Sequence, residues 1–263
     1  MQFSTKEPDI SVLISTYNNR RFVAKKLAEI ERQTFFPRAE FIFIETASPE
    51  KERTLLVPFC SKHPNCRLIA LDERKNLYEA WNIGWGTARA GIVCYTNMDD
   101  CMHPCLLEQV VDSFRRRRWD ACSVLIAKQS ADDPQLDDWA VERLRWLPLG
   151  LRPGPFTAWR NDLKSHIGFF DDRFVVAGDK DLWARMCARG LRLGLVPKVL
   201  YLYTKDPEHQ LSKSSDACAC DRSLIAGSPY PFRWSTSLRW QVVLLRTLLR
   251  HFPKAVTIRI PIA

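Results

Sequence analysis

The chain has 263 residues, of which 46% are hydrophobic and 26% charged, a composition typical of a globular protein with a sizeable core. Intrinsically disordered, collagen-like and miniature disulfide-rich proteins are therefore excluded. The net charge of +9 is uneven, because residues 222–263 hold seven basic and no acidic side chains while residues 1–221 carry only +2.

Strands and helices are predicted to alternate along the first half of the chain. Residues 10–15 (ISVLIS) are almost continuously apolar, as in a parallel strand that is covered on both faces. Between residues 20 and 33, apolar side chains recur at three- and four-residue spacing, which predicts an amphipathic helix. The same patterns predict strands over 41–45, 67–71, 92–96 and 121–127, and helices over 51–62, 77–88 and 104–117. Such alternation builds an α/β fold with a mostly parallel, Rossmann-like sheet flanked by helices, and ligands bind beyond the carboxyl ends of its strands.

The sequence lacks the motifs of several classes of nucleotide-binding and hydrolytic enzymes. The chain has no Walker A loop, and no G-x-G-x-x-G loop follows the first predicted strand. It also has no G-x-S-x-G sequence, on which α/β hydrolases carry their serine nucleophile. P-loop enzymes, Rossmann dehydrogenases and Ser/His/Asp hydrolases are therefore not favoured.

An acidic pair directly follows the strand predicted at 92–96. In the sequence Asn97-Met98-Asp99-Asp100, two neighbouring carboxylates repel each other, and a bound divalent cation would remove that repulsion. The motif therefore indicates a site for a metal ion and a diphosphate. The alternative is that it caps the helix predicted from Pro104.

Five segments occur in the order that is typical of one enzyme family. They are residues 10–18 (ISVLISTYN), 45–48 (ETAS) and 76–82 (NLYEAWN), the pair Asp99-Asp100, and residues 178–183 (GDKDLW). Together they resemble glycosyltransferase family 2, the inverting enzymes of GT-A fold, over about residues 9–215.

The resemblance also implies how the chain is divided. A GT-A domain is expected over 1–215, with its nucleotide-sugar-binding part at 1–128 and its acceptor-binding and catalytic-base part at 129–215. After residue 130 the periodic pattern loosens around a short helix predicted at 138–146. A basic amphipathic tail, residues 216–263, is expected to form a helical appendage.

A nucleotide-diphosphate-sugar is the donor that the resemblance implies, with a UDP-sugar favoured. Its contacts would come from the first loop, the end of the second strand, the start of the 77–88 helix and the acidic motif. The implied residues are Thr16, Tyr17, Asn18, Glu45, Ser48, Asn76, Asn97 and Asp99. Glu45 departs from the aspartate usual in the family, and Asn76 is equally suited to cap its helix.

The metal-binding signature of the family is written D-x-D, and Asn97 or Met98 takes its first position here, depending on register. The resemblance implies that Asp99 faces the ribose or the metal and that Asp100 coordinates Mn²⁺ or Mg²⁺. Hard oxygen ligands and a diphosphate favour these ions over zinc. His209 stands where some members place a histidine over the metal or diphosphate, and a solvated loop residue is the alternative.

Asp179 is the residue to which the resemblance assigns the catalytic base, which takes the proton of the acceptor hydroxyl. A periodic run follows it, so capping a helix is its alternative role. Asp181 is the less favoured base and is expected to bind the acceptor. Trp159 and Arg160 resemble the segment that lines the acceptor side, where an aromatic ring stacks on a sugar; core packing is an equally good role for Trp159.

The basic carboxyl-terminal segment is predicted to contact a membrane surface. Over residues 237–252, arginines alternate with apolar side chains as in an interfacial helix on anionic lipid; packing on the body or on a partner is the alternative. No uncharged apolar run reaches the about 20 residues of a bilayer span, and residues 1–9 lack the apolar centre of a secretory signal. We expect a cytoplasmic protein, peripheral on the inner face of the membrane, that does not bind nucleic acid.

The expected function is inverting transfer of a sugar from a nucleotide-diphosphate donor to a hydroxyl of a saccharide or lipid-linked saccharide, in surface-polysaccharide assembly. Two other functions stay open. One is a degenerate, non-catalytic nucleotide- or saccharide-binding module, because Glu45 and Asn97 depart from the family pattern. The other is a nucleotidyltransferase of related topology, although its glycine-rich triphosphate loop is missing after the first strand.

Overall fold

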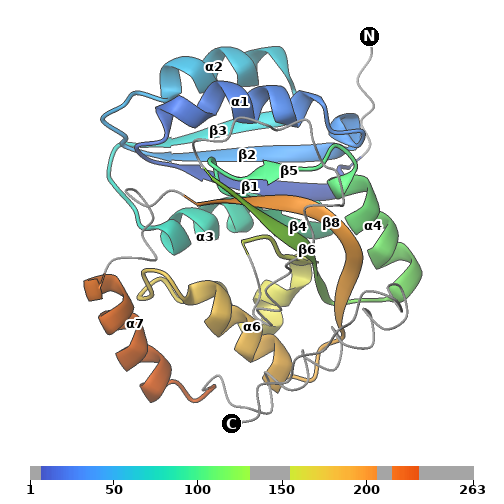
Figure 1. The fold of residues 1–263 in the computed structure, drawn as a ribbon, viewed down its shortest axis with the longest axis vertical. Helices are drawn as coiled ribbons and strands as arrows, with labels where there is room; N and C mark the ends of the chain where they lie inside the picture. Colours follow the sequence, from blue (N-terminus) through green and yellow to red (C-terminus); the bar gives the residue numbers. More distant parts are fainter. Residues whose placement is uncertain (1–6, 131–154, 206–214, 231–263) are drawn as a thin grey trace.

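One eight-stranded sheet with helices on both faces organises the protein (Figure 1), whose computed structural model describes residues 7–130, 155–205 and 215–230. The strands are β1 (Ile10–Thr16), β2 (Ala39–Thr46), β3 (Cys66–Leu71), β4 (Ile92–Tyr95), β5 (Cys101–Met102), β6 (Ala121–Ser130), β7 (Ala158–Arg160) and β8 (Leu193–Lys205). The helices are α1 (Arg20–Glu31), α2 (Arg53–Lys62), α3 (Leu77–Thr87), α4 (Leu106–Arg117), α5 (Lys164–Ile167), α6 (Gly178–Ala188) and α7 (Ser215–Gly227). In space the strands follow the order β3-β2-β1-β4-β7-β6-β8-β5.

Strands β1 to β4 form the parallel half of the sheet. β1 pairs with β2 and β4, and β2 pairs with β3, in every case in parallel. Thr16 lies beside Glu45 and Thr46 beside Leu71, so these strands end at one edge. Their continuous apolar runs follow from burial on both faces. The edge at which the sequence predicted ligands is therefore present.

The other half of the sheet is mixed. β7 pairs antiparallel with both β4 and β6, and β8 pairs in parallel with β6 and antiparallel with β5. Of β5, β6, β7 and β8, only β6 was predicted. β5 and β7 have two and three residues, too few for a periodic pattern, and their pairing depends on contacts far along the chain. β8 matters for the site because it runs beside β5, directly after the acidic motif.

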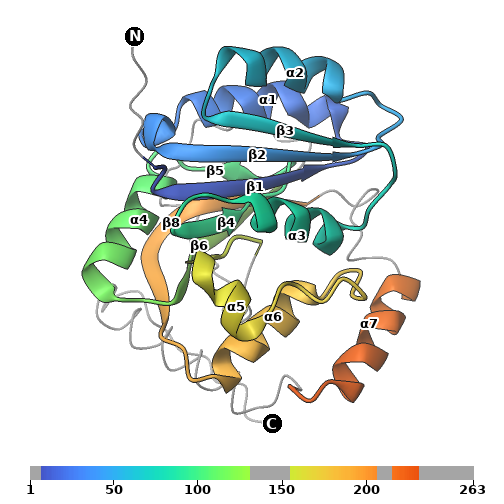
Figure 2. The same ribbon diagram turned by 180° about the vertical axis from the view of Figure 1, so that it is seen from behind.

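Two hydrophobic layers cover the sheet, one on each face. α1, α2 and α4 pack on one face through Val23, Leu56 and Val110. α3 and α6 pack on the opposite face through Trp85 and Leu182. Figure 2 shows these two helix layers from behind, with the sheet between them. Each such fully buried side chain contributes about 1.5–3 kcal/mol.

The elements predicted over residues 10–127 are confirmed with small shifts at their ends. α2 and α4 each begin two residues later than predicted. For α2 the reason is Lys51, whose φ of +58° does not fit a helix. The helix predicted at 138–146 and the segment 237–252 lie outside the described residues.

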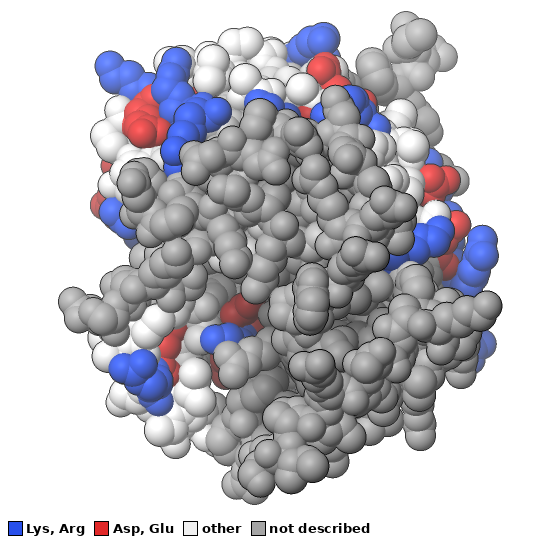
Figure 3. Space-filling view, viewed as in Figure 1, with Lys and Arg blue, Asp and Glu red and all other residues white. Residues whose placement is uncertain are grey.

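The described residues contain no helix suited to span a membrane, and their charges on one face are mixed in sign. None of the helices in these parts of the chain has the length and apolar character to cross a bilayer. On the face drawn in Figure 3, the visible lysine and arginine side chains lie next to aspartate and glutamate.

Candidate functional site

The loops after β1 and β2 lie side by side at the carboxyl edge of the sheet. The backbone N–H of Asn18 donates to Ser48 Oγ at 3.0 Å. Glu52, at the start of α2, accepts from the N–H of Asn19 at 2.8 Å and from Thr16 Oγ1 at 3.3 Å. Three predicted donor-site residues are thus brought together, and the buried Glu52 that joins their loops was not predicted.

Glu45 is a framework residue of this edge. Its buried carboxylate accepts from the backbone N–H of Ser48 with one oxygen and pairs with Arg53 through the other. Arg53 in turn donates to the carbonyl of Leu71 and to Asp72. Because one oxygen is bonded to Ser48 and the other to Arg53, which reaches the end of β3, the predicted nucleotide contact of the Glu45 carboxylate is not favoured.

An aromatic and cationic pair borders the same loops. The guanidinium carbon of Arg74 lies 4.0 Å from the centroid of the half-buried Tyr17 ring. Such cation–π contacts hold the ring in place. Tyr17 therefore offers an oriented aromatic face where a nucleotide was predicted.

Asn76 caps α3, which is one of its two predicted roles. Its Oδ1 accepts from the N–H groups of Tyr78 and Glu79, both at 2.9 Å, and Glu79 completes the capping box by accepting from the N–H of Asn76. Its Nδ2 donates to the carbonyl of Asp172 at 2.7 Å. Asn76 thereby joins α3 to the loop that precedes α6.

Asp100 is buried with only 1% of its surface exposed, and the protein holds both of its carboxylate oxygens. Oδ1 accepts from the N–H of Thr204 at 2.8 Å, and Oδ2 accepts from Asn97 Nδ2 at 2.8 Å and Tyr201 Oη at 2.9 Å. Lys26, buried in α1, donates to the carbonyl of Asp100 at 2.7 Å. Metal coordination by Asp100 stays a prediction, and it is less favoured than coordination by Asp99 because the Asp100 carboxylate already accepts three hydrogen bonds. Asp99, which is only partly buried, is better placed.

The charge of this acidic pair suits a cation. Burial and, after it, the neighbouring charge of Asp99 raise the pKa of Asp100 to about 8, although the hydrogen bonds from Thr204 and Asn97 oppose the rise. A divalent ion would offset this repulsion. The described residues contain no cluster of three or more His, Cys, Asp or Glu side chains. A hard cation here would take its remaining ligands from water and substrate phosphates, as Mg²⁺ commonly does.

Asp179 lies in the first turn of α6 against Tyr78. A methyl group on Gly178 would come within 2.9 Å of the Tyr78 ring, so glycine permits this close approach. The amino cap of α6 is Ala177, and Asp179 Oδ1 accepts from the N–H of Lys180 at 2.8 Å. Asp179 therefore does not cap α6, which was its alternative role.

Burial raises the pKa of Asp179 to about 6, although Lys180 and hydrogen bonds, among them one from Tyr78, lower it. The group is still mostly ionised at neutral pH. Burial is the main cause that raises the pKa of Tyr95, the last residue of β4, and the charges of Asp179 and Asp100 both add to the rise. The two acidic segments therefore converge on Tyr95 from α6 and from the end of β4.

Trp159 and Arg160 do not line an acceptor site, which corrects the expectation for both. Trp159 is 0% exposed and packs edge-on against Trp85 at 5.1 Å, so its alternative role in the core is the one observed. Arg160 pairs with Ile92, the first residue of β4, and therefore lies at the opposite edge from the site. Its Nε donates to the carbonyl of Trp119.

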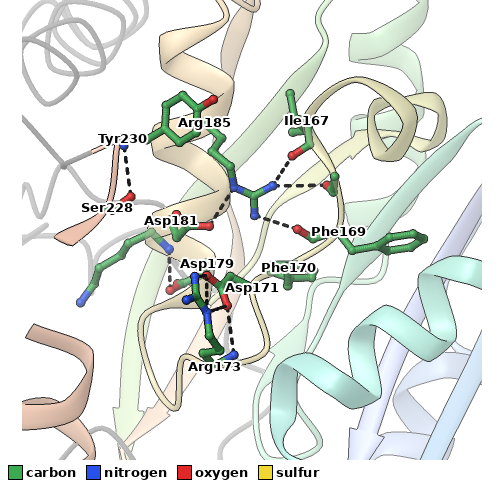
Figure 4. Close-up of polar contacts among 12 residues, drawn as sticks. Ile167, Phe169, Phe170, Asp171, Arg173, Asp179, Asp181, Arg185, Ser228 and Tyr230 are labelled. Carbon is green, nitrogen blue, oxygen red and sulfur yellow. Dashed lines mark hydrogen bonds and ion pairs between the residues drawn. The ribbon is translucent and has the colours of Figure 1, made fainter. Parts of the chain in front are cut away.

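Asp181 faces a cavity on the other side of α6. Its carboxylate accepts from Arg185 Nε at 2.8 Å, and Arg185 also donates to the carbonyls of Ile167, Gly168 and Phe169. Figure 4 shows this fork between α6 and the loop before it. The expected role of Asp181 on the acceptor side remains a proposal. His209 lies outside the described residues.

Asp221 of α7 holds the loop that leads to Asp179. Its carboxylate, in a residue 2% exposed, accepts from the N–H groups of Val175 and Val176, both at 2.8 Å. α7 begins where the basic tail was expected to begin, and this contact ties it to the body.

Replacing Asp221 with alanine is expected to lower the free energy of unfolding by about 2–4 kcal/mol, because two buried N–H groups lose their acceptor at about 1–3 kcal/mol each. Chemical denaturation measures the change, with the surface variant Asp112→Ala as control. A loss of unfolding free energy below about 0.5 kcal/mol would contradict the proposal that Asp221 holds this loop in place.

Besides Glu52 and Arg74, five further residues that support the site were missed from the sequence: Lys26, Tyr78, Tyr201, Thr204 and Asp221. A signal existed for Lys26, since it interrupts the apolar stripe of its amphipathic helix. Tyr201 and Thr204 gave no such signal, because they meet Asp100 across about 100 residues of sequence.

Comparison with known proteins finds sugar-transferring relatives. Residues 11–170 match the family model of glycosyl transferase family 2. The chain is 26% identical over 132 residues to the succinoglycan biosynthesis protein ExoO of Rhizobium meliloti (strain 1021), covering 50% of this chain and 36% of ExoO. It is 24% identical over 106 residues to an uncharacterized glycosyltransferase, alr2836, of Nostoc sp., covering 40% and 33%. Each match thus spans about a third of the relative.

Two solved structures share the fold. S. aureus TarS 1-349 in complex with UDP-GlcNAc superposes with a TM-score of 0.67 at 15% identity, covering 92% of this chain and 73% of that one. Mannosyltransferase PcManGT from Pyrobaculum calidifontis in complex with GDP-Man and Mn²⁺ gives 0.60 at 17% identity, covering 95% and 82%. The predicted GT-A fold is confirmed.

Proposed function

Since the chain belongs to glycosyl transferase family 2, we propose that this glycosyltransferase moves a sugar from a nucleotide-diphosphate donor to a saccharide hydroxyl with inversion. One observation carries the proposal: the acidic motif after β4 and Asp179 of α6 converge at the carboxyl edge of the sheet, around Tyr95. A displacement of this kind needs a site for the leaving diphosphate and a carboxylate for the acceptor proton.

The donor lies, in this proposal, against the loops after β1 and β2. Thr16, Asn18 and Ser48 shape the pocket floor through their mutual contacts, and Tyr17 with Arg74 above its ring flanks the base. Glu45 supports the loop after β2 through Ser48 and Arg53, whereas Asn76 joins α3 to the loop before α6. A UDP-sugar remains the favoured donor, and the complexes of the two structural neighbours hold UDP-GlcNAc and GDP-Man.

Asp99 is the residue we assign to a Mn²⁺ or Mg²⁺ ion, in place of Asp100. Asp100 instead fixes the turn from within, through Asn97, Tyr201 and Thr204. Such an ion supplies Lewis-acid stabilisation of the charge that develops on the departing diphosphate. The neighbour PcManGT was solved with Mn²⁺.

Asp179 accepts the proton of the acceptor hydroxyl as its oxygen forms a bond to the anomeric carbon. The bond from that carbon to the diphosphate oxygen breaks on the opposite face, so the configuration inverts. The raised pKa, about 6, leaves the carboxylate ionised at neutral pH yet more basic than an exposed aspartate. Burial therefore makes the Asp179 carboxylate more basic, while the group stays mostly ionised at neutral pH.

Replacing Tyr78 with phenylalanine is expected to move the acidic limb of the pH–rate profile to higher pH. The Tyr78 hydroxyl hydrogen-bonds to the Asp179 carboxylate and lowers its pKa, so its loss raises that pKa. A shift of about 0.4–1 pH unit corresponds to one hydrogen bond. The measurement is kcat/KM between pH 5 and 8; an unmoved limb in a folded variant would refute this positioning role.

The acceptor is proposed to be a saccharide or lipid-linked saccharide used in polysaccharide assembly. The relative ExoO is named for succinoglycan biosynthesis, and the basic segment 237–252 would bring the enzyme to a lipid-linked acceptor at the inner face of the membrane. Flotation of the full chain with anionic liposomes, compared with neutral ones, tests that contact.

Product analysis tests the proposed function. The full chain is incubated with Mn²⁺ and a panel of UDP-, GDP- and dTDP-sugars, and the released phosphates are separated by chromatography. Release of a nucleoside diphosphate is expected from one donor class. Release of pyrophosphate would indicate a nucleotidyltransferase, and donor binding with neither product would indicate a non-catalytic module.

A further inference from the structure

The loop between α5 and α6, residues 168–177, leads to Asp179 without forming a helix or a strand. Its position therefore depends on side chains that bind its backbone. Asp221 of α7 holds the second half of the loop. The first half is held by two asparagines of the α3 region, Asn76 at the amino cap and Asn82 within the helix.

Asn82 pairs with the backbone of Phe170 as a neighbouring strand would. Its Nδ2 donates to the carbonyl of Phe170 at 2.9 Å, and its Oδ1 accepts from the N–H of the same residue at 2.9 Å. Phe170 is 3% exposed, and the centroid of its ring lies 5.5 Å from those of Tyr78 and Trp81 in α3. Both the backbone and the ring of Phe170 are thus fixed on this helix.

Asn76 uses the two ends of its amide for different contacts. Oδ1 caps α3, whereas Nδ2 donates to the carbonyl of Asp172 at 2.7 Å. Two residues earlier, the guanidinium carbon of Arg74 lies 4.0 Å from the centroid of the Tyr17 ring. The start of α3 therefore contacts the proposed donor site through Arg74 and the loop 168–177 through Asn76.

α3 also contacts Asp179 itself. Gly178 lies so close to the Tyr78 ring that a methyl group would come within 2.9 Å of it, and the Tyr78 hydroxyl hydrogen-bonds to the Asp179 carboxylate. The titratable groups that act on Asp179 are Lys180 of α6, Tyr78 of α3 and Tyr95 of β4. The environment of Asp179 thus depends on how the loop before α6 sits on α3.

We propose that Asn76 is a positioning residue for Asp179: its amide holds the loop before α6 in register with the donor loops, so that Asp179 meets the acceptor hydroxyl in the reactive position. This inference rests on the proposed function, and Asn82 supports the same loop. An error of about 1 Å in the placement of reacting groups costs about 100-fold in rate. Asn76 therefore affects catalysis without touching a substrate.

Replacing Asn76 with serine separates its two contacts. Serine caps a helix as well as asparagine does, but its side chain is too short to reach the carbonyl of Asp172. We expect kcat for transfer to fall by ~10- to 100-fold, while the KM for the donor changes less than about threefold. Asn82→Ala, which loses both bonds to Phe170, should show the same division between kcat and KM.

Asn65→Ser is the matched control. Asn65 directly precedes β3, so it lies at the edge of the sheet opposite the site, and its Nδ2 donates to the carbonyls of Phe36 and Ala39 at 2.8 and 3.1 Å. This variant also loses amide bonds to backbone carbonyls, and it should keep the kcat of the wild type. Chemical denaturation compares its stability with that of Asn76→Ser.

The pKa of Asp179 gives a readout that needs no substrate. It is measured by carboxyl ¹³C NMR, in which the signal is identified by its absence from Asp179→Asn. Burial, the largest influence, raises this pKa to about 6. In Asn76→Ser the carboxylate gains contact with water, so its pKa should fall towards the about 3.9 of an exposed aspartate. The acidic limb of kcat/KM should move to lower pH with it, and Asn65→Ser should leave both unchanged.

Three results would overturn the proposal. Asn76→Ser could keep both the kcat and the Asp179 pKa of the wild type. It could instead raise the donor KM at unchanged kcat, which would make Asn76 a nucleotide contact. Asn65→Ser could lower kcat as much as Asn76→Ser does, which would indicate a general loss of stability. If the wild type releases no nucleoside diphosphate, the proposed function fails, whereas the titration still decides whether Asn76 holds Asp179 in place.

Discussion

Replacing Asp179 with asparagine is expected to lower the rate of sugar transfer by ~100-fold or more, the scale of removing a general base. Asparagine keeps the shape of the side chain but cannot take the proton of the acceptor hydroxyl. The donor loops after β1 and β2 are untouched, so nucleotide binding should be retained. Steady-state kinetics and titration with the nucleoside diphosphate measure the two effects.

The pH profile adds a second signature to the same residue. Burial raises the pKa of Asp179 to about 6, and only the ionised form accepts a proton. The value of kcat/KM should therefore rise with pH between about 5 and 7 and then level off. Asp172→Asn, an exposed aspartate of the adjacent loop, serves as control and should keep both rate and profile. A rate of Asp179→Asn within tenfold of the wild type would exclude Asp179 as the base.

Replacing Asp99 with asparagine is expected to weaken metal-dependent donor binding by roughly 100-fold or more. Removing a residue that merely orients a metal ligand costs about 10–100-fold in metal affinity or activity, and Asp99 is proposed to be a ligand itself. Calorimetric titration of the nucleoside diphosphate with and without Mn²⁺ measures the loss. Chelation of the wild type with excess EDTA should reduce its affinity to that of Asp99→Asn.

Replacing Asp100 is the matched comparison for the Asp99→Asn variant. Its carboxylate is bonded to Asn97, Tyr201 and Thr204, so Asp100→Ala should lower the melting temperature even without metal, by removing an acceptor from three buried donors. Asp99→Asn should change the metal-free melting temperature less. Full donor binding in excess EDTA, or a greater metal dependence of Asp100→Ala than of Asp99→Asn, would contradict the assignment of Asp99.

The parallel half of the sheet could be predicted from the sequence because its signals are local. Each strand there is a short apolar run, each helix has its own periodic stripe, and the carboxyl ends of parallel strands must share an edge. The position of the acidic motif at that edge followed from the same reasoning, whereas Ser48 was implied by the family resemblance.

The mixed half could not be predicted in the same way. Trp159 and Arg160 belong to a three-residue strand whose register against β4 decides which edge each side chain occupies. Nothing near them in the sequence reports that register. The sequence also does not distinguish a tryptophan that stacks on a sugar from one that packs in the core.

The choice between Asp99 and Asp100 shows the same limit on a smaller scale. The two are chemically identical neighbours, and only the passage of β8 beneath the turn decides which is buried. Tyr201 and Thr204 donate hydrogen bonds to the buried carboxylate of Asp100, whereas Asp99 is only partly buried. The motif indicated the chemistry, whereas the fold determines the division of roles.

Diffraction from crystals of the full chain soaked with Mn²⁺ and the best-binding nucleoside diphosphate tests the central claim most directly. The anomalous signal of manganese should lie within about 2.3 Å of an Asp99 oxygen and of the diphosphate, with Asp179 across the cleft from them. Manganese bound elsewhere, or a diphosphate on the far side of α6 from Asp179, would contradict the proposed site.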